Sequence, residues 1–219
     1  MWKIIIFSSI CIYAAVLAAI CPTTGLNDAV RNSIVNIHNS FRSKLAQGQS
    51  LMKGGKKAAS AKNMYKLKYD CAAEKTAQIW ADKCVFQHSK NSFRNAGENL
   101  FMMSTPNYNL QSSMTKAAEL WWKELSDFGG ISSTNTTLTM SIFSLGIGHW
   151  SQMAWAKSTI IGCGYKSCPK MTIVVCHYKT TGNFINQKIY EIGTPCKVDK
   201  DCTTYANSKC DLSTKLCFN

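Results

Sequence analysis

The sequence predicts an α+β domain followed by a small cysteine-rich tail. Helical periodicity governs residues 27–128, and two β-rich runs lie together after it, so helices and strands do not alternate. The last segment, 196–219, contains four cysteines and few large apolar side chains. Such a tail cannot bury a core of its own, so we expect disulfides to hold its shape. The 46% hydrophobic composition of the whole chain excludes wholesale disorder.

Residues 1–19 are typical of a secretory signal peptide. Lys3 precedes an apolar stretch that is short for a bilayer span, and Ala18 and Ala19 suit the signal peptidase. No basic stop-transfer cluster follows, which disfavours an uncleaved anchor. Cleavage would remove Cys11 and leave ten of the 11 cysteines, an even number that predicts up to five disulfides in a secreted, extracellular protein. We expect no transmembrane segment after signal cleavage.

Three helices are predicted before the strands. Apolar side chains recur at steps of three and four over 27–46, after a capping Asn or Asp. Similar patterns predict a helix over 70–84 that begins at Asp70, and another over 114–128 that ends at a Gly-Gly pair. The Gly-, Ser- and Lys-rich segment 48–63 between the first two helices predicts an exposed, mobile loop.

The β-rich runs 159–166 and 171–179 predict an antiparallel pair near the centre of a sheet. A loop over 129–139 precedes them and contains Asn135-Thr136-Thr137, an N-glycosylation acceptor in a secreted chain.

The positive charge of the chain is regional. Its 25 Lys and Arg against 12 Asp and Glu give a formal net charge of +13. Segment 29–69 contains no acid, and its bases are Arg31, Arg42, Lys44, Lys53, Lys56, Lys57, Lys62, Lys66 and Lys68. This basic stretch could bind glycosaminoglycans or another anionic surface, or simply keep the protein soluble. Nucleic acid is excluded as a partner, because the compartment is wrong and no base-stacking motif accompanies the bases.

Four short strings occur together in a characteristic order. They are HNSFR (38–42), GENL (97–100), GHWSQMAWAKS (148–158) and VVCHYKTTGNF (174–184). In this order and spacing they resemble the CAP superfamily of cysteine-rich secretory proteins, antigen 5 venom allergens and pathogenesis-related-1 proteins. The strings CP, YDCAAEKTA and YEIGTPC further resemble the activation-associated secreted and venom-allergen-like proteins of nematodes.

The resemblance implies a fold, domain limits and a disulfide pattern. The fold is a three-layer α-β-α sandwich with a central cleft, over residues 20–192, with 193–219 as the cysteine-rich C-terminal tail. The implied pairs are Cys84 with Cys168 and Cys163 with Cys176, and Cys21 with Cys71 is then the remaining pair of the domain. For the tail, Cys196, Cys202, Cys210 and Cys217 allow three connectivities.

The resemblance also implies a cleft that presents two histidines and two glutamates. By motif these are His88, Glu98, Glu124 and His149. Two imidazoles and two carboxylates can hold Zn or Mg weakly, can act as acid and base, or can simply brace the cleft through hydrogen bonds.

Three further residues have competing interpretations. His38 lies on the apolar stripe of the first helix and is predicted to be a core histidine. His177 lies in a central strand and could face either side of the sheet. Ser151 follows His149 by two residues, but without a G-x-S-x-G elbow we expect it to form hydrogen bonds and not to act as a nucleophile.

Three functions follow as hypotheses. The first is a secreted binding protein without enzymatic activity, which binds a lipid or sterol or a host protein and modulates host defence. The second is a metal-dependent hydrolase that uses the cleft His/Glu tetrad. The third is binding of glycosaminoglycans through the basic stretch. No nucleophile or oxyanion hole is evident, which favours binding over catalysis and assigns no catalytic residue.

Overall fold

The structure is a computed structural model that describes residues 20–21 and 25–219. The predicted signal peptide, 1–19, lies outside the described residues. Within the described part of the chain, no helix is both long and apolar enough to cross a membrane.

A four-stranded sheet forms the centre of the molecule. Its strand order is β1 (Lys68–Tyr69), β4 (Ile160–Ser167), β5 (Thr172–Lys179) and β2 (Gly97–Met103). β5 pairs antiparallel with both β4 and β2, whereas β1 pairs parallel with β4. The predicted antiparallel pair is therefore confirmed, and β5 is a central strand. Local sequence patterns predict neither β2 nor β1.

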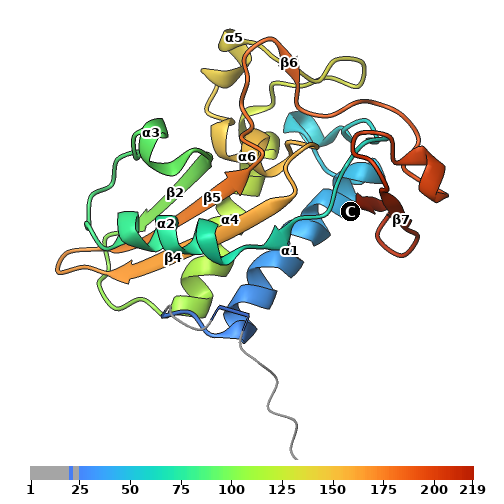
Figure 1. Cartoon of the computed structure of the whole chain (residues 1–219). Coiled ribbons are helices and arrows are strands. Elements are labelled where there is room, and N and C mark those ends of the chain that lie inside the picture. The colour runs from blue at the N-terminus through green and yellow to red at the C-terminus, as the bar shows by residue number, and fades with distance from the viewer. Residues whose placement is uncertain (1–19, 22–24) are drawn as a thin grey trace, which may run out of the picture.

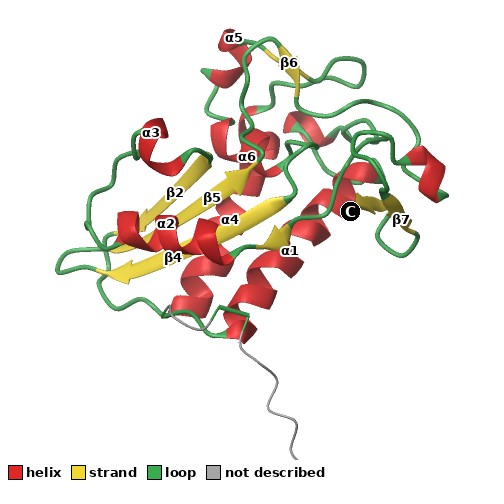
Figure 2. Ribbon diagram, in the orientation of Figure 1, coloured by secondary structure: helices red, strands yellow, loops and turns green. Residues whose placement is uncertain are grey.

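Helices cover both faces of this sheet, which confirms the α+β sandwich (Figures 1 and 2). α2 (Cys71–Ala81) packs on one face, mainly against β4 and β5. α1 (Asp28–Ala46) and α4 (Leu110–Phe128) pack against each other and cover the opposite face. α4 begins four residues before the predicted helix because Asn109 caps it, accepting a hydrogen bond from the backbone N of Ser112.

The side chains of β5 alternate between two apolar clusters. Ile173 and Val175 pack with alanines of α2, whereas Val174, Cys176 and Tyr178 pack with α1 and α4. This alternation places a buried layer on each face of the sheet.

Two glycines let α2 lie directly on β4. A Cβ atom at Gly162 would lie 2.2 Å from the backbone N of Glu74, and one at Gly164 would lie 2.5 Å from Cα of Gln78. The neighbouring atoms are backbone, so they cannot rotate out of the way. Glycine is therefore required at both positions for the helix to approach the sheet.

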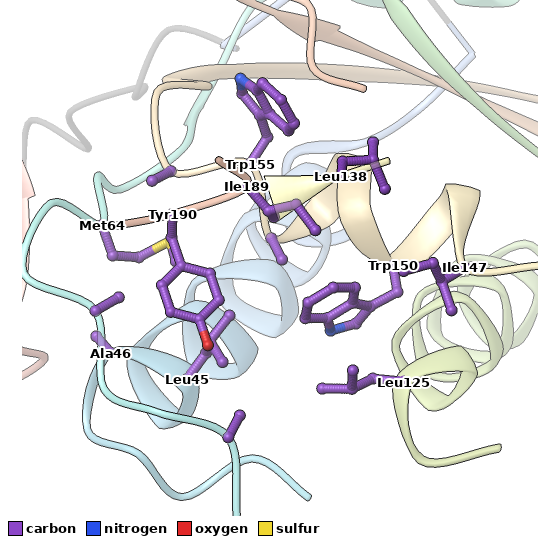
Figure 3. Packing of buried hydrophobic residues seen from close by; sticks show 14 of the residues in the cluster. Leu45, Ala46, Met64, Leu125, Leu138, Ile147, Trp150, Trp155, Ile189 and Tyr190 are labelled. Atoms are coloured by element: carbon purple, nitrogen blue, oxygen red, sulfur yellow. The ribbon is translucent and has the colours of Figure 1, made fainter. Parts of the chain in front are cut away.

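A third cluster lies beside the sheet, around Trp150 and Tyr190 (Figure 3). The prediction of an exposed loop over 48–63 is wrong in part because this segment contributes to that cluster. Met52, Ala58 and Ala61 are buried there, while the 3₁₀ turn Lys53–Gly55 is exposed. The sequence does not indicate this burial, because the lysines make the average composition of the segment polar although its alanines are buried.

The tail folds against the domain. A short hairpin of β7 (Lys209–Asp211) and β8 (Leu216–Phe218) is held by disulfides Cys196–Cys210 and Cys202–Cys217, and a 3₁₀ turn spans Asp199–Asp201. The buried ring of Tyr65 packs among the tail cysteines, and its hydroxyl hydrogen-bonds to Ser208 at 2.9 Å. The apolar core of the tail therefore includes a side chain of the domain.

The remaining three disulfides are those that the resemblance implied. They join Cys21 to Cys71, Cys84 to Cys168 and Cys163 to Cys176. A second small sheet pairs β3 (Thr137–Leu138) with β6 (Gln187–Lys188). Asn135, in the predicted glycosylation acceptor just before β3, is exposed.

Most bases of the 29–69 stretch have a structural partner. Arg31 is buried and pairs with Glu74 and Asp28. Lys62 pairs with Glu191, Lys66 with Asp211, and the Lys68 ammonium with the backbone O of Asn219. Among the described residues, the exposed Lys44, Lys53, Lys56 and Lys57 form no ion pair, so the unpaired positive charge at this surface is smaller than the sequence count indicates.

His38 is a core histidine, as predicted. Its Nδ1 lies 2.8 Å from the backbone O of Ile34 and its Nε2 lies 3.0 Å from the hydroxyl of Tyr178. Burial lowers the pKa of His38 to about 4, and the nearby Arg42 charge also lowers it. The folded protein therefore keeps this imidazole neutral at any pH above about 4.

We expect His38 to make stability depend on pH. The unfolded chain takes up a proton here below about pH 6.5, so the full contribution is present above that pH and is lost as the pH falls towards the folded pKa. As the pH falls from 6.5 to 4.5, the free energy of unfolding of the wild type should decrease by about 1.4 kcal/mol per pH unit more than that of His38→Gln. Urea unfolding of both proteins at several pH values measures the difference, and parallel curves would contradict the expectation.

Candidate functional site

A cleft of about 590 Å³ opens at one end of the sheet. One side is formed by α3 (Asn91–Arg94) and the start of β2, and the other by α5 (Met140–Phe143) and α6 (Gly148–Met153). In Figure 1 these elements lie at the top of the molecule. All four residues of the predicted tetrad line this cleft, namely His88, Glu98, Glu124 and His149.

Glu98 is the centre of the first half of the site. Its side chain is fully buried at the start of β2, where it faces His177 across the β2–β5 register. One carboxylate oxygen lies 2.8 Å from Nδ1 of His88 and accepts from the backbone N of Ser89 at 2.9 Å. The other oxygen accepts from the Ser89 hydroxyl at 2.7 Å and lies 3.0 Å from Nε2 of His177.

These contacts keep Glu98 ionised. Burial by itself raises the pKa of a carboxyl group, but the hydrogen bonds from His177, His88 and Ser89 outweigh it and hold the pKa of Glu98 well below its usual range. A buried carboxylate is thus held between two imidazoles at neutral pH.

Glu124 and His149 form the second half of the site. Glu124 projects from α4, and its Oε1 lies 2.5 Å from Nδ1 of His149. Its Oε2 accepts from the backbone N atoms of His149 and Trp150 at 3.0 and 2.9 Å, at the start of α6. The carboxylate therefore fixes both the imidazole and the short helix from which it extends.

The chain has four histidines, and they differ in how many of their ring nitrogens have a hydrogen-bonding partner. In His38 both nitrogens have partners, and so do both in His177, where Nδ1 lies 2.9 Å from the Thr76 hydroxyl. In His88 and His149 only Nδ1 is bound, in each case by a carboxylate. Within the described residues, Nε2 of these two imidazoles forms no hydrogen bond.

This donor set fits a metal that prefers nitrogen. A carboxylate on Nδ1 holds the proton there and leaves the lone pair on Nε2, which is the usual arrangement behind a histidine that binds zinc. The carboxylates of Glu98 and Glu124 are already hydrogen-bonded to the imidazoles. Among the described residues, the one group of three ligand atoms within 4.8 Å of one another belongs to Cys196, Cys202 and Cys210, which are oxidised in disulfides, so the tetrad is not a cluster by that measure.

Sequence reasoning left the orientation of His177 open and did not identify Ser89. His177 faces the α2 side of the sheet, where it contacts Thr76 and Glu98. The alternation of β5 could have indicated this orientation once Val175 was known to face α2. Ser151 has a hydrogen-bonding role, as predicted, because its hydroxyl donates to Oδ1 of Asn183 at 2.6 Å and not to an imidazole.

The chain is similar to several secreted proteins and venom allergens. It is 36% identical over 200 residues to an Ancylostoma secreted protein of Ancylostoma caninum. The aligned region covers 90% of this chain and 46% of that protein. The chain thus spans about half the length of that relative. It is 34% identical to Venom allergen 5.02 of Dolichovespula maculata, with 76% of this chain and 79% of the allergen covered.

Solved structures agree with this similarity. The crystal structure of NaASP2 with Zn²⁺ superposes with a TM-score of 0.81 at 37% identity, covering 90% of this chain and 99% of the other. The structure of BmVAL-1 superposes with a TM-score of 0.85 at 37% identity, covering 91% and 98%. The model of the cysteine-rich secretory protein (CAP) family matches residues 35–178. The chain therefore belongs to the cysteine-rich secretory protein family.

Proposed function

We propose that this chain is a secreted binding protein whose cleft captures a divalent transition metal through His88 and His149. The observation that supports the proposal most strongly is the pair of imidazoles whose Nδ1 atoms are held by Glu98 and Glu124. Their Nε2 atoms remain available to a metal, and nitrogen donors favour zinc over magnesium. When bound, zinc would supply a Lewis-acidic centre for an anionic or carbonyl group of a ligand.

Binding is proposed in preference to catalysis because the serine that follows His149 by two residues has another role. Ser151 is buried, and its Oγ is engaged by Asn183 and by the backbone O of Gly148. A nucleophile needs an adjacent base within hydrogen-bond reach. Within the described chain, no serine, threonine or cysteine is hydrogen-bonded to His88 or His149.

The rim of the cleft supports a ligand with an apolar part, such as a lipid or a sterol. Phe143 and Phe184 line the cleft and expose 37% and 48% of their surface. A ligand of this kind could place its polar end at the imidazoles and its apolar part against these rings. Five disulfides and an exposed Asn135 support a secreted, glycosylated protein.

Isothermal titration of the metal-free protein with zinc tests the metal site. Wild type should bind one zinc ion, and His88→Ala or His149→Ala should each weaken binding by at least about tenfold. Gln87→Ala is the matched control, since Gln87 is exposed beside His88 and uses only its backbone N and O in the loop. Unchanged affinity in the double alanine variant would place the zinc elsewhere and overturn the proposal.

The same proteins test the hydrolase alternative. Zinc-loaded wild type should hydrolyse ester and peptide substrates no faster than the double alanine variant. Hydrolysis that requires both histidines and is abolished by a chelator would establish catalysis in place of simple binding.

A further inference from the structure

The connection between α2 and α3, residues 82–90, exposes apolar side chains that have no role in the cleft. Val85 and Phe86 expose 45% and 51% of their surface, and Phe93 in α3 exposes 38%. In Figure 1 this α2–α3 loop runs along the outer edge of the sheet. Exposed apolar side chains that gather on one surface indicate a binding face.

The exposure of the loop is fixed by its own contacts. Its beginning is tied to the sheet by the disulfide Cys84–Cys168. Nε1 of Trp80 donates to the backbone O of Gln87 at 2.7 Å, and the backbone N of Gln87 donates to the O of Val85 at 3.0 Å. These bonds close a tight turn around Phe86. The turn therefore holds Val85 and Phe86 outward and prevents their collapse onto α2.

One lysine lies against two aromatic rings at the base of this loop. The rings of Trp80 and Phe93 lie 5.9 Å apart, and the Lys83 ammonium lies 4.4 Å from the centre of the Trp80 ring and 5.7 Å from that of Phe93. On α2, Lys75 and Ile79 are exposed at helical spacing from Lys83, so the mixed basic and apolar surface extends along the helix.

Apart from Asp82, the charged residues of this surface are basic. Segment 83–97 contains Lys83, Lys90 and Arg94 and no acid. The acid before it, Asp82, pairs with Lys166 at 3.1 Å, and the acid after it, Glu98, is buried in the cleft. An anionic partner is therefore favoured.

We propose that the α2–α3 loop docks on an anionic phospholipid membrane. Val85 and Phe86 would enter the boundary between headgroups and acyl chains, while Lys83 and Lys90 would remain at the level of the phosphates. A sulfated glycan would bind the basic side chains but has no apolar region in which Val85 and Phe86 could be buried. These two exposed side chains therefore favour a membrane. His88 follows Phe86 by two residues, so docking brings the mouth of the cleft to the lipid surface.

Co-sedimentation with vesicles tests this docking. Full-length secreted protein is mixed with vesicles of phosphatidylcholine alone or of phosphatidylcholine with about 30% phosphatidylserine, at low and high salt. Wild type should bind the anionic vesicles and not the neutral ones. The Val85→Ser, Phe86→Ser double variant should bind at least about tenfold more weakly, and Lys83→Gln with Lys90→Gln about tenfold more weakly at low salt.

Leu212→Ser is the matched control, because Leu212 exposes 59% of its surface in the tail. It should bind vesicles as wild type does. Thermal melting and zinc titration of each variant show that fold and cleft are intact, so loss of vesicle binding with zinc affinity retained would support the proposal. The proposal is overturned if wild type does not bind anionic vesicles, or if the Val85→Ser, Phe86→Ser variant binds them as tightly as wild type. It is also overturned if the protein binds a heparin column but not the vesicles.

Discussion

Replacing Arg42 with methionine should lower the free energy of unfolding by about 3–5 kcal/mol. The guanidinium is fully buried, and it donates to five backbone carbonyls, those of Tyr65, Met153, Trp155, Ala156 and Ser158, at 2.7–3.1 Å. Burial lowers the pKa of Arg42 to about 9, which leaves it protonated at neutral pH. Methionine preserves the side-chain volume but leaves several of these buried carbonyls without a donor.

Urea unfolding with the disulfides intact measures this loss. Arg42→Lys should recover only part of it, because a single ammonium cannot reach five carbonyls at once. Lys44→Met on the same helix is the control, since Lys44 is exposed and its replacement should change stability by no more than about 0.5 kcal/mol. A similar small change at Arg42 would show that the carbonyls are satisfied in another way.

Gly162→Ala should destabilise the fold by about 3 kcal/mol. The new methyl group would lie 2.2 Å from the backbone N of Glu74 and would force α2 away from β4. α2 is tethered through Cys71, its first residue, and through Cys84 just after its end, so it cannot move freely. Strain would spread through the face of the sheet that holds His177.

Gly25→Ala is the control for this substitution. A Cβ at Gly25 meets no atom of the described residues within 4 Å, so this variant should melt at nearly the wild-type temperature. Thermal melting followed by near-ultraviolet circular dichroism compares the two proteins. A Gly162→Ala protein that melts with the Gly25→Ala control would mean that α2 does not press on β4 as described.

The sequence predicted the long elements and missed the short or unusual ones. The stripe of α1 and the β-branched runs of β4 and β5 each extend over eight or more residues, enough for periodicity to be visible. β2 was noticed only for its motif because its burial is nearly continuous, without the alternation that identifies a strand. Two-residue strands such as β1 depend on their partners and give no local pattern.

The site divides in the same way. The tetrad came from motif resemblance, and the structure places its members as two carboxylate–imidazole pairs. Nothing in local sequence indicates that His177 completes the partners of Glu98, since the two meet only through the register of β2 with β5. Charge was similarly misleading, because a count of bases cannot show that Arg31 and Arg42 are buried.

The division of the cleft into two pairs has a consequence for thermodynamic coupling. His88 bonds to Glu98 on β2, His149 bonds to Glu124 on α4, and the two pairs share no hydrogen bond within the described chain. The two pairs share no hydrogen-bonding partner among the described residues, so the metal-free protein should show less coupling energy between the two histidines than the metal-bound protein. An ion held by both would create that coupling. The metal would then act as a reversible cross-link between the two sides of the cleft, and its concentration would set how firmly they are joined.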